Sequence, residues 1–380
     1  MATVGDVLSS FDDFPVHQTS HPVARTASTD LNHYDRYFFN GYSRDQDADD
    51  ALYFGCAMGL YPNRHVADAS FSLVVGGTAA GAEQISVHAS RRAPDDRREA
   101  NHVGPIQVDV VEPLKTLRVL VDAPDEGLRA ELTFRARSAP LEEPHFFHRT
   151  GNRVVLDYTR LTQFGRWEGW IDLGGKRFTC SPADTWGSRD RSWGVRPVGE
   201  RAPTGAPVAD PQFFWLWAPI SFGELATHFD VNETSTGERW HETGFLVPDG
   251  HPSVAADEVR YDVAWRSGTR WAQRFDLDLV TPSGTTHVAL EPLYHFQMCG
   301  LGYGHPEWGH GVWKGELETG GGRWGLPVPD PCALHHVHVQ TICRARARGA
   351  AGEHEGVGIL ESYVVGEHEP TGLTGIADPA

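Results

Sequence analysis

The sequence lacks the residue patterns that mark several common classes of protein. Its five cysteines lie far apart and form no Cys-x-x-Cys pair, so neither a disulfide scaffold nor a zinc ribbon is indicated. No run approaches the roughly 18–20 apolar residues of a membrane-spanning helix. The first residues show neither the basic start nor the apolar centre of a signal peptide. We therefore expect a cytoplasmic protein with no integral membrane segment.

Positive charge is also scarce. Lysine and arginine total 33 against 51 aspartates and glutamates, which gives a net charge of −18. A phosphate backbone or an anionic membrane surface would be repelled, so we expect no nucleic-acid partner. The Gly-x-Ser-x-Gly elbow of hydrolases, the P-loop and the dinucleotide fingerprint are all missing from the sequence. We therefore expect a protein that works without a cofactor.

What the sequence does contain is the material for β-sheet. Hydrophobic residues make up 40% of it, and 41 glycines with 25 prolines favour short strands joined by turns. Apolar and polar residues alternate in several segments, and each such segment is expected to be a strand with one face in water. Examples are the segments 131–135, 275–279 and 84–87. The sequence therefore predicts an all-β fold of antiparallel sheet, closed into barrels or packed as a sandwich.

The length of 380 residues fits two domains of about 150–200 residues each. The stretch 198–212 is rich in proline and glycine and is expected to be a loop between them. We therefore expect an N-terminal barrel over residues 1–200 and a C-terminal barrel over residues 201–380.

The segment Asp184–Arg196 holds the densest group of charged and aromatic side chains in the chain. If it is a strand, Arg189, Arg191 and Trp193 share one face while Asp190 lies on the other. An arginine that faces inward needs a carboxylate partner, most simply an aspartate of the same segment. The segment then forms either a charged plug at one end of a barrel or the floor of a pocket with a fixed cation and aromatic walls.

One motif in this region resembles a known family. It reads Asp190-Arg191-Ser192-Trp193-Gly194 and then Trp215-Leu216-Trp217. It is similar to the Asp-His-x-Trp-Gly and Trp-x-Trp pattern of the carotenoid 1,2-hydratase (hydroxyneurosporene synthase) superfamily, which includes AttH-like proteins. The resemblance implies two tandem lipocalin-like antiparallel β-barrels with few short helices. It also implies a pocket for a hydrophobic ligand.

The chain departs from the family pattern at Arg191. The hydratases have a histidine of their acid-catalytic set there, and arginine does not release a proton at neutral pH. The resemblance also implies a carboxylate on the strand after Trp-x-Trp, where Asp230 stands by length. His228 shares a strand face with Asp230, so the two are a candidate acid pair, unless both simply face solvent. The candidate catalytic residues are therefore Asp230, His228, Arg191 and Asp190.

Acid-catalysed chemistry on a hydrophobic substrate would need the acidic, aromatic and arginine side chains found in this region. Protonation of an alkene needs an acid that an apolar pocket keeps protonated and aromatic faces that stabilise positive charge. A fixed arginine suits a substrate with a carbonyl, carboxylate or phosphate oxygen, as in an isoprenoid- or polyketide-like molecule. The candidates for the aromatic walls are Trp186, Trp193, Trp215 and Trp217.

A second group of candidate residues lies between residues 294 and 313. Tyrosines and histidines stand there among glycines, which let the backbone bend tightly around a ligand or a barrel corner. The histidines are either general acids or bases, or caps of the loop. Tyr294, Tyr303, His305 and His310 are the candidate substrate-binding residues of this segment.

Two further segments combine polar and aromatic residues. In the segment 32–39, Tyr34 and Asp35 either line a barrel mouth or belong to a buried strand. In the His335–His338 run, a strand would place His336 and His338 on one face, as paired metal ligands would be. No matching ligand motif occurs elsewhere, so we predict no metal.

These observations predict a cofactor-independent acid–base lyase or isomerase, of hydratase, dehydratase or cyclase type. Its substrate is expected to be a hydrophobic isoprenoid- or polyketide-like molecule. Lipocalin-like barrels also bind without reacting, so the alternative is a non-enzymatic carrier of a lipid or pigment. A barrel filled by its own side chains would instead indicate a structural protein.

Overall fold

The computed structural model describes residues 10–15, 25–93, 101–200, 205, 210–349 and 352–380. Strands dominate this part of the chain, and the helical elements within it are 3-10 turns of three or four residues. None of the described residues forms a helix that is long and apolar enough to cross a membrane. The 3-10 turns are η1 (Ser10–Asp13), η2 (Pro62–Arg64), η3 (Pro124–Glu126), η4 (Met298–Leu301) and η5 (Glu369–Thr371).

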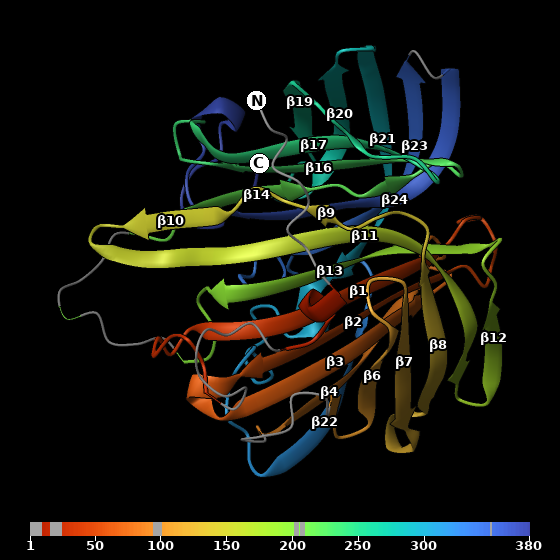
Figure 1. Cartoon of the computed structure of the whole chain (residues 1–380), viewed down its shortest axis with the longest axis vertical. Helices are drawn as coiled ribbons and strands as arrows, with labels where there is room; N and C mark the ends of the chain where they lie inside the picture. The colour runs from red at the N-terminus through yellow and green to blue at the C-terminus, as the bar shows by residue number, and fades with distance from the viewer. Residues whose placement is uncertain (1–9, 16–24, 94–100, 201–204, 206–209, 350–351) are drawn as a thin grey trace.

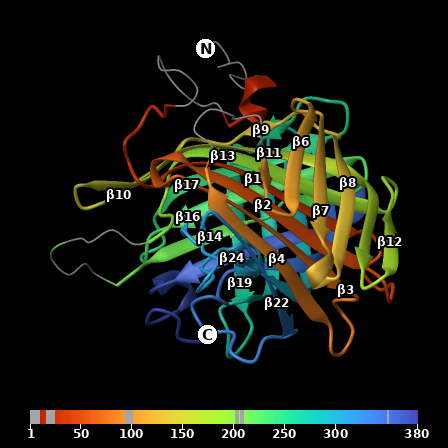
Figure 2. The same ribbon diagram turned by 90° about the horizontal axis from the view of Figure 1, so that it is seen from below.

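The first sheet has 14 strands in the order β22-β4-β3-β2-β1-β13-β11-β8-β7-β6-β5, with β9, β10 and β12 attached to β11. It forms the lower part of the molecule in Figure 1 and faces the viewer in Figure 2. Its strands are β1 (His33–Ser43), β2 (Leu52–Tyr61), β3 (Val66–Val75), β4 (Glu83–Arg92), β5 (His102–Val103), β6 (Ile106–Glu112), β7 (Thr116–Ala123), β8 (Leu128–Ala136), β9 (Leu141–Glu142), β10 (Phe146–Thr150), β11 (Arg153–Leu173), β12 (Lys176–Cys180), β13 (Thr185–Val195) and β22 (Leu317–Gly325).

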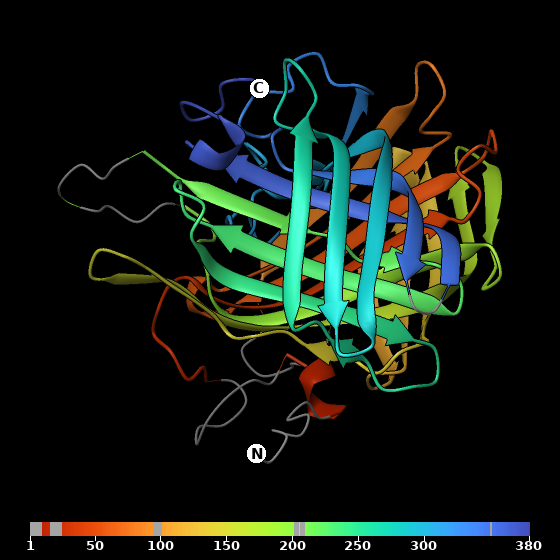
Figure 3. The same cartoon turned by 90° about the horizontal axis from the view of Figure 1, so that it is seen from above.

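The second sheet has 10 strands in the order β18-β17-β16-β14-β24-β23-β21-β20-β19, with β15 attached to β16 and β24. Its green to blue strands face the viewer in Figure 3 and cover the first sheet. They are β14 (Phe213–Trp217), β15 (Ile220–Ser221), β16 (Leu225–Glu233), β17 (Arg239–Pro248), β18 (Val254–Ala255), β19 (Glu258–Trp265), β20 (Ala272–Thr281), β21 (Gly284–Gln297), β23 (Val339–Gly349) and β24 (Gly352–Val365).

The predicted fold class is confirmed: the described chain is all-β, with two large antiparallel sheets that are consistent with tandem barrel-like domains. The chain passes from the first sheet to the second between β13 and β14, but one later strand, β22, returns to the first sheet. β22 belongs to the C-terminal half and pairs with β4 along its whole length, from Leu317 opposite Arg91 to Gly325 opposite Glu83. The predicted boundary between residues 200 and 201 adjoins residues 201–204, which lie outside the described ranges.

The alternating segments are strands, as predicted. Leu132 and Phe134 of β8 are fully buried while Glu131 and Arg135 are exposed, so this strand has one wet face. The expectation of a wet face is wrong for β4. Gln84 and Ser86 are also buried, because the segment around η4 covers that side of the strand. The amide of Gln84 donates to the Gln297 carbonyl at 2.8 Å, which satisfies a polar group that the cover removes from water.

Each sheet wraps its own apolar core, and a third core lies between the two sheets. The third core combines aromatic and aliphatic side chains of both halves, with Trp215 and Tyr303 packed at its edge. Its buried members are Phe38, Tyr42, Tyr53, Ala57, Val74, Trp186, Trp217, Tyr294, Phe296, Met298, Leu301, Ile342, Val357 and Ile359. The side chains that β1, β2 and β13 of the first sheet and β14, β21, β23 and β24 of the second direct away from their own barrels therefore meet at this interface.

Candidate active site

An ion pair that spans the two sheets stands at the centre of the candidate site. Arg160 of β11 reaches from the first sheet to Asp230 of β16 in the second. The same guanidinium binds Glu143, just after β9, and its Nε donates to Glu143 Oε2 at 2.9 Å. Both carboxylates are completely shielded from solvent. Removal of such charges from water is tolerated only when they are paired, and here one cation serves two anions.

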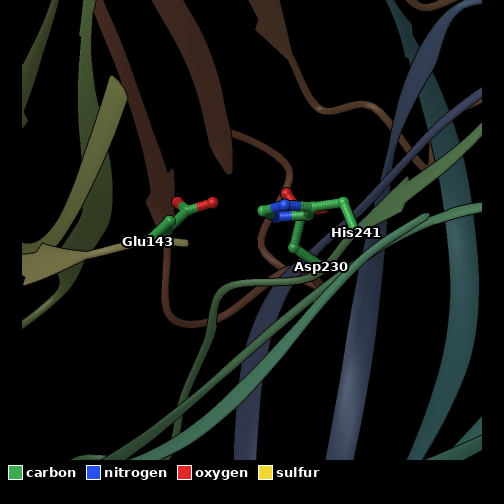
Figure 4. A group of neighbouring side chains, drawn as sticks. All are labelled: Glu143, Asp230 and His241. Carbon is green, nitrogen blue, oxygen red and sulfur yellow. The ribbon is translucent and has the colours of Figure 1, made fainter. Parts of the chain in front are cut away.

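Neutral donors hold the remaining carboxylate oxygens in place. The Thr162 hydroxyl donates to Glu143 Oε1 at 2.6 Å. The indole N–H of Trp215 lies 3.2 Å from both oxygens of Asp230. The strand period explains this convergence, since Arg160 and Thr162 are two residues apart on β11 and point to the same side. Figure 4 shows Glu143 directed at Asp230 and His241 from the opposite side of the group.

Two buried histidines complete this group. His228 Nε2 lies 3.5 Å from Glu143 Oε1, and His241 Nε2 lies 3.6 Å from Asp230 Oδ1. Burial lowers the pKa of His228 to about 4 and that of His241 to about 3, so both rings are neutral at pH 7. Neither nitrogen of His228 has a hydrogen-bond partner among the described residues. A neutral imidazole with a free nitrogen is able to accept a proton.

The group carries a net negative charge. Burial acts to raise the pKa of Glu143, but the charge of Arg160 and the hydrogen bonds from Arg160 and Thr162 outweigh it and hold that pKa below its usual value. Arg160 is one cation against the two carboxylates that it contacts. Its guanidinium also lies over the rings of Phe146, Trp215 and Trp217, at 4.6, 5.4 and 5.8 Å from their centroids. The guanidinium is thereby fixed among aromatic faces.

The ligand atoms of Glu143, Asp230 and His241 all lie within 4.8 Å of one another, which is the spacing of a possible metal site. Arg160, however, already contacts both carboxylates and supplies the positive charge that a metal ion would bring. These residues therefore fit a carboxylate pair that shares one guanidinium, which offsets part of its negative charge.

Asp190 of β13 is a carboxyl group between the two sheets whose pKa lies in the useful range for proton transfer. Burial raises its pKa to about 7, Arg160 opposes that shift and Glu143 adds to it. Its backbone neighbours across the strands are Thr162 of β11 and Phe38 of β1. Its side chain keeps some accessible surface, although most of β13 around it is buried. A carboxyl group with a pKa near neutrality keeps a protonated fraction at pH 7, which suits a general acid.

The structure brings together several of the residues predicted from the sequence. Asp230 and His228 are fully buried, so neither faces solvent. Trp215 contacts Asp230, and the Trp217 ring centroid lies 6.2 Å from that of His228. Trp186, Tyr294 and Tyr303 belong to the same inter-sheet core.

Arg191 does not join this group. The predicted alternation of β13 is correct, because Asp190 faces the second sheet while Arg189 and Arg191 face the other way. The prediction that an aspartate of the same segment pairs with Arg191 is wrong. Its partner is Asp35 of β1, and its guanidinium lies 4.2 Å from the Tyr37 ring centroid. Asp35 is available because β1 pairs with β13 and brings its side chain alongside.

The remaining predicted residues lie outside this group. Trp193 is half-buried near the end of β13, and Tyr294 donates to Gln46 at 3.2 Å. His305 accepts the backbone N–H groups of residues 307 and 308 at 3.0 and 2.9 Å, so it caps its own loop. His310 contacts Arg36 of β1.

The His335–His338 run is not a strand, since β23 begins at Val339. His338 is hydrogen-bonded to Glu361 of β24 at 2.6 Å, and Gln340 donates to the other oxygen of Glu361 at 2.5 Å. The His338 ring also stacks on Tyr363, with 4.7 Å between the ring centroids. His336 and His338 therefore do not share a strand face.

Sequence reasoning missed Glu143, Arg160 and His241. Glu143 lies beyond a two-residue strand and has no local signal. Arg160 stands in a 21-residue strand whose facing partner is set by the packing of two sheets. The only available signal was physical: a buried Asp230 requires a buried cation.

Comparisons with solved structures find the same fold. Kievitone hydratase from Nectria haematococca matches with a TM-score of 0.55 and 10% identity, over 87% of this chain and 88% of that one. An AttH-like protein from Nitrosomonas europaea matches with a TM-score of 0.55 and 12% identity, over 87% and 92%. CghA with Sch210972 matches with a TM-score of 0.51 and 12% identity, over 88% and 89%.

These three structures belong to the superfamily that the tryptophan motif resembles, so the predicted resemblance is confirmed at the level of the fold. The comparison with curated proteins finds no match. One family model matches residues 8–374, which is nearly the whole sequence. The chain therefore belongs to the family of unknown function DUF8625.

Proposed function

We propose that this protein is a cofactor-independent acid–base enzyme of hydratase or cyclase type that acts on a hydrophobic small molecule. One observation carries the proposal: Asp190, with a pKa raised by burial to about 7, shares the inter-sheet region with a fixed anionic group and tryptophan faces. The fold is shared with a protein named as a hydratase and with CghA, whose structure holds Sch210972. An isoprenoid- or polyketide-like molecule is the substrate that we propose.

The proposed chemistry begins with a proton from the Asp190 carboxyl group. Addition of that proton to an alkene carbon leaves a carbocation, and addition to a carbonyl oxygen leaves an activated enone. The faces of Trp215 and Trp217 and the net charge of the Arg160 group stabilise this positive charge. In a hydration, water then attacks the cation, and the proton that it loses passes to a neutral imidazole such as His228.

The buried charges also argue for catalysis over simple transport. A carrier of apolar molecules needs no titratable groups beside its ligand, and each one costs free energy to bury. Here two carboxylates, a guanidinium and two imidazoles are buried together between the sheets. Such groups are retained where chemistry uses them.

The test asks whether the protein moves protons between solvent and ligand. The full chain is purified, and any small molecule released on denaturation is identified by mass spectrometry. That molecule, and kievitone as a defined second probe, are incubated in D2O with wild type, with Asp190→Asn and with Asp122→Asn. Asp122 is an exposed surface residue paired with Arg129, so it serves as a matched control.

Wild type and Asp122→Asn are expected to convert at least one molecule to a product with deuterium bound to carbon. Asp190→Asn should be slower by about 100-fold or more, since a general acid contributes 10²–10⁴-fold. If wild type releases its ligand unlabelled and unchanged, the protein is a carrier and the proposal fails.

A further inference from the structure

Two arginines near the proposed site, one buried and one half-buried, form no ion pair with a carboxylate among the described residues. Arg36 of β1 is only 1% exposed, and Arg196 follows the last residue of β13. Their guanidinium carbons lie 4.5 and 5.8 Å from the centroid of the same Tyr303 ring. No carboxylate among the described residues forms an ion pair with either. By contrast, Arg160 and Arg191 each pair with a carboxylate, which offsets the cost of burying their charge.

The contacts of Arg36 leave donors unused. Its two terminal nitrogens face the two ring nitrogens of His310, the second pair at 2.7 Å. His310 Nε2 also lies 2.8 Å from the Leu301 carbonyl and must donate to it. That nitrogen therefore carries the hydrogen of the neutral ring, and only Nδ1 is able to accept from Arg36. Arg36 Nε has no partner at all among the described residues, so the guanidinium has at least two donors to spare.

Arg196 also has a hydrogen-bond donor without a partner among the described residues. Its guanidinium lies 4.6 Å from the centroid of the Tyr34 ring, and its buried Nη2 has no hydrogen-bond partner in the described structure. The side chain makes no hydrogen bond to any described group. Aromatic rings therefore contact both guanidinium groups by their faces, and Arg36 Nε and Arg196 Nη2 keep their N–H donors free.

The nearby carboxylates are already occupied. Asp35 pairs with Arg191. Asp68 accepts from the Tyr61 hydroxyl at 3.1 Å and from the Gly311 N–H at 2.7 Å. Glu361 is taken by His338 and Gln340. The two arginines are therefore left without an ion-pair partner among the described residues and with free donors, Arg36 buried and Arg196 half-buried.

Aromatic rings connect this pair to the proposed acid–base site. Tyr303 contacts His338 edge to face, with 4.8 Å between the ring centroids, and His338 contacts Trp215 in the same way at 5.9 Å. Trp215 in turn donates to Asp230. Asp190 lies near both Arg160 and Arg36, and each of these charges acts to lower the pKa of its carboxyl group.

We propose that Arg36 and Arg196 form an anion subsite that binds a carboxylate on the otherwise apolar molecule held between the two sheets. The carboxylate accepts from the free edges of both guanidinium groups, the apolar body lies along Tyr303 and Trp215, and the reacting end reaches Asp190. This assignment of the substrate class rests on the proposed function for the location of the reacting end. The anion subsite itself is a binding property and is measured without turnover.

The test compares two fluorescent probes of the same shape that differ in charge. Naphthoic acid carries a carboxylate, and naphthalenemethanol carries a neutral hydroxymethyl group in its place. Both are titrated into the full chain by fluorescence and by calorimetry, with wild type, Arg36→Gln, Arg36→Lys, Arg196→Gln and Arg348→Gln. Arg348 is an exposed arginine that pairs with Glu353, so its substitution is the matched control.

Wild type and Arg348→Gln should bind the acid at least about 10-fold more tightly than the alcohol, as hydrogen bonds to a charged group predict. Arg36→Gln and Arg196→Gln should each remove most of that preference and leave alcohol binding within about twofold. Arg36→Lys should keep part of it, because it keeps the charge. Arg196 is only half-buried, so its replacement is less disruptive to folding. If Arg36→Gln does not fold, the acid preference of Arg196→Gln tests the anion subsite.

An absent preference in wild type, or a preference that survives both Gln variants, overturns the anion subsite. The proposed function fails separately, because it is measured by deuterium incorporation and by Asp190→Asn. A protein that prefers the acid but incorporates no deuterium binds anionic ligands without reacting with them. A protein that incorporates deuterium but shows no preference acts on neutral substrates.

Discussion

Replacement of Arg160 by methionine tests the electrostatic account of the inter-sheet site. Methionine fills a similar volume but removes the positive charge that serves Glu143 and Asp230. Both carboxylates have fully buried side chains, so the loss leaves two uncompensated charges beside each other. Removal of one partner from a buried ion pair costs about 3–5 kcal/mol. We expect Arg160→Met to lower the free energy of unfolding by about that amount at pH 8.

The same reasoning gives the sign of the pH dependence. In wild type the pKa of Glu143 is held below its usual value, so this pair contributes stability above the ordinary carboxyl pKa and loses it as the pH falls. Without Arg160, burial alone acts on the carboxyl groups and raises their pKa, so the folded variant gains protons. The difference between wild type and variant should therefore shrink to about 1–3 kcal/mol near pH 5, the cost of unsatisfied hydrogen bonds.

Urea unfolding followed by tryptophan fluorescence at pH 5 and pH 8 measures both quantities. Arg135→Met is the control, since Arg135 pairs with Glu168 on the surface and should cost less than about 1 kcal/mol at either pH. The account is refuted if Arg160→Met costs no more than this control at pH 8. It is also refuted if the cost of Arg160→Met grows as the pH falls.

Two further substitutions test local contacts. Gly187→Ala places a methyl group 2.2 Å from the Asn40 carbonyl and 2.6 Å from Trp167 Nε1, which are hydrogen-bonded to each other at 2.8 Å. It should lower stability in thermal unfolding by about 1–3 kcal/mol, whereas Gly325→Ala, which meets no atom within 4 Å, should change little. Trp215→Phe removes the indole donor of Asp230, so it should cost about 1 kcal/mol of stability and slow deuterium incorporation. A Trp215→Phe enzyme with wild-type rate would show that this hydrogen bond does not position Asp230.

The sequence predicts much of the fold because strand alternation is a local property. The alternation of residues 131–135 correctly distinguishes the buried face of β8 from the exposed one. It fails at β4, where η4, more than 200 residues later in the chain, covers the polar face. The pairing of β22 with β4 lies outside the reach of local patterns for the same reason, since the register of two distant strands depends on tertiary packing.

The candidate site was partly accessible to sequence reasoning. The family resemblance implies a carboxylate at Asp230, and strand alternation adds His228 on the same face; the structure buries both of them. Arg191 illustrates the limit: alternation separates it from Asp190 but does not say which face meets the second sheet. The cation of the site comes instead from Arg160, which lies 70 residues from Asp230 and reaches it only when the sheets pack.

The pH dependence of deuterium incorporation tests most directly whether Asp190 supplies the proton. Its pKa of about 7 means that the protonated form is lost as the pH rises through neutrality. The wild-type rate should therefore be level below about pH 6 and fall about tenfold per pH unit above pH 8. Asp190→Asn should be slow at every pH and lack this transition. A wild-type rate that stays level from pH 6 to pH 9, or an Asp190→Asn enzyme with the wild-type rate, would contradict the central claim.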